Sequence, residues 1–283
     1  MSEGKIIRVF PRRTNATPDD ELAFTRPLML GDEFDDISEV HISVAFTWDM
    51  QTAEDLEFSW RGLGVPVKMG GPAFGERMSP EFVAGRYVKK GFTITSRGCP
   101  NHCWFCEVGK RAQGRIIELP IEPGWNILDD NLLATSDKHF YSVMEMLKTQ
   151  PPPAFTGGLE AKILTEDRAE AIMALKPQRM FFAYDTPDDL EPLIDAGRTL
   201  QRVGLPQNSH RALCYVLCGY PKDTMEAAET RMWQTIEAGF MPFAMVYRDN
   251  LGKRNPAWIT FQREWANHFI VGTKMNEYWR THK

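Results

Sequence analysis

The sequence predicts an α/β fold, in which a small α/β domain precedes a partial (β/α)6 barrel. From about position 90 onward, short and continuously apolar runs alternate with amphipathic helical patterns. This alternation is typical of right-handed β-α-β units and a parallel sheet. The chain has 283 residues, 43% of them hydrophobic and 25% charged, which is ordinary for a globular enzyme.

Six apolar runs are predicted as the strands of this barrel. A helix start is marked by Thr165, with acids in the next two positions, and a second by the pair Asp223-Thr224. Six parallel strands make a barrel that is open on one side, with the chemistry at the carboxyl ends of the strands. The runs are 92–95, 125–128, 154–156, 180–184, 213–217 and 243–247.

Three parts are expected along the chain. Residues 1–88 are predicted as the small α/β domain, with strands at 6–10, 40–46 and 65–69 and a helix at 52–63. Residues 89–250 are predicted as the barrel. Residues 251–283 are rich in tryptophan and are predicted to hold one helix, from about 258 to 269.

Charge and cysteine usage restrict the environment of the protein. The net charge of -5 gives no general attraction to nucleic acid or to anionic membranes. We find no apolar run that is long enough to span a bilayer and no signal-peptide core. The five cysteines are odd in number and unevenly placed, so they suit a metal site better than a disulfide framework. We therefore expect a cytoplasmic protein with no membrane partner.

The most informative segment contains Cys99, Cys103 and Cys106. Three thiolates at this spacing can converge on a four-iron four-sulfur (4Fe-4S) cluster and leave its fourth iron without a protein ligand. Electron-transfer ferredoxins instead use four cysteines for each cluster. A structural zinc site with His102 as fourth ligand is an alternative, although such sites usually pair ligands from two separate turns. A trio of inert buried cysteines is another.

The Cys-x3-Cys-x2-Cys spacing resembles the radical S-adenosylmethionine (radical SAM) superfamily. Phe105 before the last cysteine and the preceding segment Thr95-Ser96-Arg97-Gly98 add to the resemblance, which covers roughly positions 90 to 250. It implies a partial TIM-like barrel. It also implies an enzyme that reductively cleaves S-adenosylmethionine at the cluster to a 5'-deoxyadenosyl radical, which abstracts hydrogen from a substrate. Isomerase and transferase subclasses both fit.

The resemblance also implies where the cofactor is bound. Many relatives carry a Gly-Gly-Glu segment after the second strand, and this chain has Asp129, Asp130 and Asn131 there. Glu160 follows two glycines after the third strand and is placed to reach the ribose or the ammonium group. Gly219 opens a turn similar to the family's adenine-contacting turn, although a plain strand-to-helix turn with an N-cap explains it equally. Asp185 ends the fourth strand, on the predicted ligand face.

Two residues are candidates for direct roles in catalysis. Tyr184 ends the fourth strand beside Asp185. Cys214, in the fifth strand, can donate a hydrogen atom to a substrate radical. The alternative for Cys214 is that it is a small core residue.

The remaining expectations concern the first domain and the partners. The first domain resembles a degenerate cobalamin-binding domain, but it is too short for a full one, so we do not expect bound cobalamin. The family needs an electron donor such as flavodoxin or ferredoxin. The substrate class is open, with a nucleobase, a nucleotide-linked group or nucleic acid as the hypothesis. The alternatives to an enzyme are a non-catalytic α/β binding protein with structural zinc and an electron-transfer iron–sulfur protein.

Overall fold

The computed structural model describes residues 4–77, 82–249 and 251–282. The chain divides into two compact units, Met1–Phe92 and Thr93–Lys283. The first unit ends close to the predicted boundary after residue 88, and the segment 251–283 belongs to the second unit.

The first unit is built on a four-stranded parallel sheet. Its strands are in the order β2-β1-β3-β4, and the helix α1 (Met50–Trp60) connects β3 to β4. Apolar side chains of β1 and β3 are fully buried with Trp60 of α1, so the predicted α/β character is confirmed. β2, which has two residues, gave no sequence signal. The strands are β1 (Lys5–Val9), β2 (Ala23–Phe24), β3 (Ile37–Ser43) and β4 (Val67–Gly70).

Polar residues occupy the other face of this sheet. His41 on β3 is buried, and its ring nitrogens lie 2.6 Å from the Tyr87 hydroxyl and 2.6 Å from a Glu39 carboxylate oxygen. Lys68 on β4 donates to the other Glu39 oxygen over 2.9 Å. Because Glu39 and His41 are two positions apart in a strand, they share a face, and the pairing offsets the cost of burying them.

The second unit contains a six-stranded sheet whose strands follow the chain order. The sheet runs β12-β11-β10-β9-β8-β5, and the pairs from β8 to β12 are parallel. Right-handed crossovers between consecutive parallel strands place the connecting helices on the same face of the sheet. The strands are β5 (Phe92–Thr93), β8 (Asn126–Ile127), β9 (Ala154–Phe155), β10 (Arg179–Tyr184), β11 (Ala212–Cys218) and β12 (Met241–Val246).

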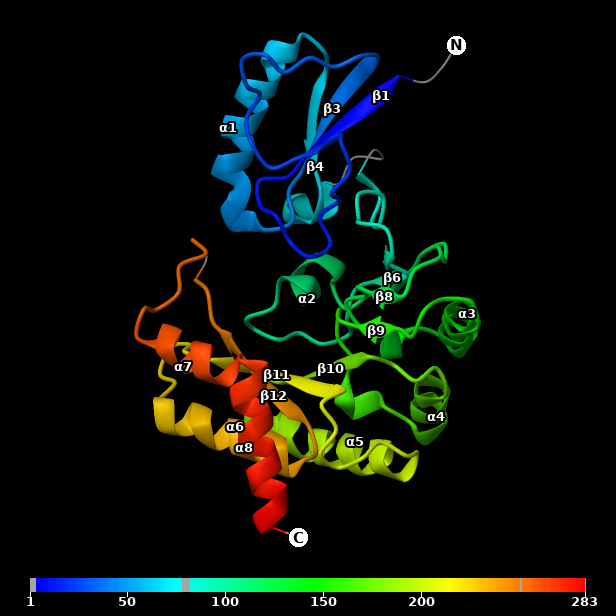
Figure 1. Cartoon of the computed structure of the whole chain (residues 1–283), viewed down its shortest axis with the longest axis vertical. Coiled ribbons are helices and arrows are strands. Elements are labelled where there is room, and N and C mark those ends of the chain that lie inside the picture. Colours follow the sequence, from blue (N-terminus) through cyan, green and yellow to red (C-terminus); the bar gives the residue numbers. More distant parts are fainter. Residues whose placement is uncertain (1–3, 78–81, 250, 283) are drawn as a thin grey trace. The chain divides into compact units, whose positions relative to one another are not determined.

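The connecting helices begin where the sequence predicted. The hydroxyl of Thr165 accepts a hydrogen bond from the Arg168 N–H, and that of Thr224 accepts one from the Ala227 N–H, which confirms both helix starts. Figure 1 shows the four helices following one another around the strands. They are α3 (Asp137–Lys148), α4 (Glu166–Ala174), α5 (Leu190–Arg202) and α6 (Met225–Glu237).

The predicted strand at 92–95 is shorter than expected. β5 ends at Thr93, and the chain then forms β6 (Ser96–Arg97), which pairs antiparallel with β7 (Ile117–Glu118). The cysteine segment is therefore enclosed between two short antiparallel strands and does not leave the parallel sheet directly.

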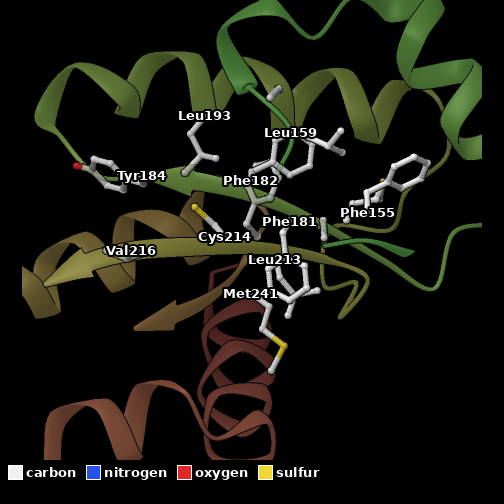
Figure 2. Packing of buried hydrophobic residues seen from close by; sticks show 14 of the residues in the cluster. Phe155, Leu159, Phe181, Phe182, Tyr184, Leu193, Leu213, Cys214, Val216 and Met241 are labelled. Atoms are coloured by element: carbon white, nitrogen blue, oxygen red, sulfur yellow. The ribbon is translucent and has the colours of Figure 1, made fainter. Parts of the chain in front are cut away.

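The main core lies between the long strands and their helices. Phe182 on β10 and Leu193 on α5 are 1% and 0% exposed, and Figure 2 shows them beside Cys214 of β11. Tyr184 is the last residue of β10. Burial of these large side chains is the main source of stability for this unit.

The tail differs from the prediction of a single helix at 258–269. It forms two helices, α7 (Trp258–Trp265) and α8 (His268–Thr281). The break is at Asn267, whose side-chain oxygen accepts hydrogen bonds from the N–H groups of Phe269 and Ile270 and so starts the second helix. Across residues 4–77, 82–249 and 251–282, we find no helix with the length and apolarity needed to cross a bilayer.

We expect Asn267→Ala to lower the free energy of unfolding by about 1 kcal/mol, because two amides at the start of α8 lose their acceptor. Asn276→Ala, at an exposed position within α8, is the matched control and should change it by less than about 0.5 kcal/mol. Urea unfolding measures both. Equal effects would contradict a capping role for Asn267.

Candidate functional site

The cysteine loop runs from Gly98 to Cys106 and leads into the short helix α2 (Glu107–Ala112). The side chains of Cys99, Cys103 and Cys106 are partly exposed. A backbone hydrogen bond of 3.0 Å from the Cys106 N–H to the Cys103 carbonyl closes the turn between the last two. Gly98 has φ +101°, and a β-carbon there would lie 1.9 Å from the Arg115 carbonyl oxygen, so the loop can start only from glycine.

The three thiols influence one another electrostatically. Burial raises the pKa of the Cys99 thiol. The pKa of Cys103 is raised to about 11, first by burial and then by the charges of Cys106 and Cys99. Cys99 and Cys103 are therefore harder to ionise than free thiols, and a positively charged ligand beside them would favour their thiolate forms.

Within the described part of the chain, no three His, Cys, Asp or Glu side chains converge on a position where a single metal ion would be bound. His102 is exposed, and its ring lies against Gly114. The three cysteines of the loop are free thiols.

Asp129, which follows β8, is a central polar residue of this region. It is 1% exposed, and its carboxylate accepts hydrogen bonds from the Thr95 N–H (2.6 Å), the Thr95 hydroxyl (2.6 Å) and the Ser96 hydroxyl (2.8 Å). Burial raises its pKa, while the hydrogen bonds from Thr95 and Ser96 act in the opposite direction. The carboxylate thus ties the end of β8 to the segment that enters the cysteine loop.

Asp130 and Asn131 continue this connection. Asp130 accepts from the Gly98 N–H (2.9 Å) and from the Arg97 guanidinium (3.0 Å). The Asn131 amide donates to the Cys99 sulfur over 3.6 Å. Its Oδ1 is buried and has no hydrogen-bond partner among the described residues. Both aspartates have protein partners, whereas Asn131 has a free acceptor beside a cysteine of the loop.

Glu160 reaches the cysteine loop from the segment after β9. Its carboxylate accepts a hydrogen bond from the side-chain amide of Asn101, which lies between Cys99 and Cys103. Burial raises the pKa of Glu160, with a further contribution from Asp189. The approach depends on Gly157, where a β-carbon would lie 2.1 Å from the Asp129 carbonyl oxygen.

Asp185 adds a further carboxylate after β10. Its pKa is raised to about 7, first by burial and then by the nearby carboxylates of Asp189 and Glu160. Asp189 accepts three hydrogen bonds, from the N–H groups of Asp185 and Thr186 and from the Thr186 hydroxyl. Asp185 and Asp189 also raise the pKa of Cys103, so acidic groups and thiols lie within electrostatic range of one another.

The two catalytic candidates are located in the core. The Tyr184 side chain is 3% exposed, and its hydroxyl donates to the side-chain oxygen of Gln234 over 2.8 Å. Cys214 is 0% exposed, and burial raises the pKa of its thiol well above the usual range. For Cys214 this location favours the alternative of a small core residue.

Gly219 begins a strand-to-helix turn after β11. Its N–H donates to Asp223 over 2.8 Å, and Asp223 is paired with Arg231 at 2.9 Å. With Thr224 as N-cap of α6, these contacts account for the turn. A contact between Gly219 and a cofactor remains a prediction.

An aromatic group connects the cysteine loop to this turn. Trp104, which follows Cys103, is 52% exposed. Its ring centroid lies 6.0 Å from that of Tyr220, after β11, and 5.6 Å from that of Tyr247, after β12.

Comparison with models of known protein families and with curated proteins finds no match for this chain. The fold alone gives the structural class of the chain, which is α/β with mainly parallel sheets.

The sequence did not reveal several residues that shape the site. The partners of Asp129 and Glu160 are Thr95, Ser96 and Asn101, all close to the cysteines. The sequence shows that these three side chains can donate hydrogen bonds beside the cysteines. It does not show their acceptors, because Asp129 and Glu160 follow other strands and the pairing depends on the order of the strands in the sheet.

We expect Asp129→Ala to lower the free energy of unfolding by about 2–3 kcal/mol, because the buried Thr95 N–H and two hydroxyls lose their acceptor. Asp137→Ala is the control, since Asp137 is exposed and pairs with Arg168, and it should cost less than about 1 kcal/mol. Urea unfolding measures both. A cost for Asp129→Ala no larger than that of the control would contradict its bracing role.

Asp185 should make stability depend on pH. The folded chain keeps its proton up to about pH 7, whereas the unfolded chain releases it near 3.8. Between these values the folded state binds more protons, so stability should fall as pH rises, by up to about 1.4 kcal/mol per pH unit.

In urea titrations from pH 4 to 7 on the chain prepared without iron, Asp185→Asn should therefore flatten this slope. Asp188→Asn, at an exposed neighbouring position, should keep the wild-type slope. If stability depends on pH in Asp185→Asn as it does in the wild type, the raised pKa is wrongly assigned to Asp185.

Proposed function

We propose that this chain is a radical SAM enzyme that binds a 4Fe-4S cluster through Cys99, Cys103 and Cys106. The observation that carries the proposal is the single loop with three partly exposed thiols, to which Glu160 is hydrogen-bonded through Asn101. When bound, the cluster and S-adenosylmethionine would supply the electron and the 5'-deoxyadenosyl radical that removes hydrogen from the substrate.

The charges around the loop support this assignment. The thiol of Cys103 and the carboxyls of Glu160 and Asp185 all have raised pKa values, and in each case acidic neighbours contribute to the rise. A site with this excess of acidic groups gains most from ligands that carry positive charge. Iron ions and the sulfonium and ammonium groups of S-adenosylmethionine are ligands of this kind.

Asn131 provides a position for one of these groups. Its buried Oδ1 needs a donor, since an unsatisfied buried acceptor costs free energy. The other end of the same amide donates to Cys99. An ammonium group bound close to the cluster would complete its hydrogen bonding. In this proposal Asp129 and Asp130 hold the loop in place, and Asn131 and Glu160 face the cofactor.

The arrangement of strands supports a partial barrel. The sequential order from β5 to β12 is the order in which strands of a (β/α) barrel follow one another. Glu160 follows β9 and Asp185 follows β10, which places both after the carboxyl ends of their strands, where such barrels bind ligands.

The environment and partners complete the proposal. Free thiols of this kind persist in a reducing compartment, so we place the protein in the cytoplasm. A small electron carrier such as flavodoxin or ferredoxin would reduce the cluster.

The decisive experiment is anaerobic reconstitution with iron and sulfide, followed by dithionite and S-adenosylmethionine. We expect 5'-deoxyadenosine, detected by mass spectrometry, from the wild-type chain. Cys103→Ala should abolish it because one iron loses its ligand. Cys214→Ala is the matched control, since Cys214 lies in the core. It should retain the activity and cost about 1 kcal/mol of stability.

Metal analysis distinguishes the alternatives. Iron and sulfide with 5'-deoxyadenosine support the proposal. Zinc in place of iron would indicate a structural site. A redox-active cluster without cofactor cleavage, in the presence of the substrate class tested below, would indicate electron transfer. Retained 5'-deoxyadenosine formation in Cys103→Ala would refute the cluster assignment.

A further inference from the structure

We propose that a cleft after the carboxyl ends of β11 and β12 binds a phosphorylated nucleoside, the substrate class of the neighbouring cysteine loop. This inference rests on the function proposed above for that loop. It assigns recognition to residues outside the thiol and carboxylate groups already described.

The cleft has a volume of about 450 Å³ and is formed by three segments. One wall is the turn from Gly219 to Asp223, and another is the chain after β12 at Tyr247 and Asp249. The remainder comes from residues 253–255 and from Trp258 at the start of α7. This volume suits a small organic ligand.

The basic residues of the cleft are available to a ligand. Lys222, Lys253 and Arg254 line it. Neither lysine has an ion-pair partner among the residues that the structure describes. Arg254 donates to the neutral side chain of Gln262 over 2.9 Å and so keeps its charge uncompensated.

The acidic residues of the cleft are occupied by contacts within the protein. Asp223 is paired with the buried Arg231 at 2.9 Å. Asp249 accepts hydrogen bonds from the N–H groups of Leu251 (2.9 Å) and Lys253 (2.8 Å), which fix a turn. The charge that remains for a ligand is positive, so the cleft favours an anion. A phosphate monoester carries a charge of about -1.5 to -2 at neutral pH.

Aromatic rings provide the second half of the recognition. Tyr220 and Tyr247 line the cleft and contact the exposed ring of Trp104. An exposed tryptophan beside two tyrosines is a stacking surface for a planar base. Because Trp104 follows Cys103 directly, a base stacked there would lie next to the cysteine loop, while its phosphate would meet the lysines.

The position of Lys222 adds to this argument. Its φ is +73°, in the left-handed region that favours glycine and is costly for a residue with a β-carbon. A lysine at such a position is consistent with selection for its charge. S-adenosylmethionine carries positive charge on its sulfonium, so these lysines disfavour it as the occupant.

The test uses equilibrium dialysis of the full-length, iron-reconstituted protein. The probes are the 5'-monophosphates of adenosine, guanosine, cytidine and uridine, their free nucleosides, and inorganic phosphate. We expect at least one monophosphate to bind at least about tenfold more tightly than its nucleoside and than phosphate, and to weaken as salt is added.

The double variant Lys222→Gln/Lys253→Gln should weaken that binding by at least about tenfold. Glutamine keeps the β-carbon at position 222, so backbone strain does not change. The matched control is Lys176→Gln/Lys138→Gln. Lys176 is also exposed and has φ +53°, and Lys138 is exposed on α3. The control should bind as the wild type does.

Three results would overturn the proposal: equal binding of nucleoside and monophosphate, unchanged affinity in the cleft variant, and displacement of the nucleotide by S-adenosylmethionine. The last would assign the cleft to the cofactor. Nucleotide binding and 5'-deoxyadenosine formation are measured separately on the wild-type chain, which distinguishes this proposal from the proposed function. If the wild type binds the nucleotide but does not cleave S-adenosylmethionine, only the proposed function is refuted. If it cleaves S-adenosylmethionine but does not bind the nucleotide, only the assignment of the cleft is refuted.

Discussion

The buried carboxylate of Asp129 is the interaction on which the rest of the site depends. It accepts three hydrogen bonds from Thr95 and Ser96, and the adjacent Asp130 holds the N–H of Gly98. Together they fix the start of the cysteine loop relative to the end of β8. The cysteine loop is short and its thiols are partly exposed, so it has little buried core to hold its conformation. These hydrogen bonds fix the loop to the sheet instead.

The site combines an acidic environment with thiols that resist ionisation. Cys103 has a pKa of about 11 and Asp185 one of about 7, and burial is the first cause of both shifts. Such groups destabilise one another when they are ionised without a counter-charge. Assembly of a metal cluster would relieve this repulsion, so cluster binding and folding stability are expected to be coupled. The cleft beyond Trp104 has the opposite character, because the basic residues Lys222, Lys253 and Arg254 line it. Two neighbouring regions of opposite charge would let one protein bind a cationic cofactor and an anionic substrate without exchanging them.

The sequence predicted the elements that are determined locally. The apolar runs of β10 and β11 and the threonine caps of α4 and α6 lie within a few residues of their predicted positions, because periodicity and capping act over one or two turns. β2 was missed, and the tail was predicted as one helix although Asn267 divides it. For the site, the position of the cysteine loop could be read from the sequence, but the hydrogen-bond partners of Asp129 and Tyr184 could not. The first depends on donors 33 and 34 positions away, and the second on a partner 50 positions away.

The close packing at Gly98 and Gly157 has a consequence for evolution. A β-carbon at either position would lie about 2 Å from a backbone oxygen, of Arg115 or of Asp129 respectively, and a backbone atom cannot move away as a side chain can. In a saturation library of this chain, both positions should therefore accept no other amino acid, whatever the substrate. The exposed Lys253 has no backbone constraint of this kind, so a change there alters recognition and leaves the frame intact. Descendants of this chain would then share an unchanged frame around the cysteines and differ in the molecules they recognise.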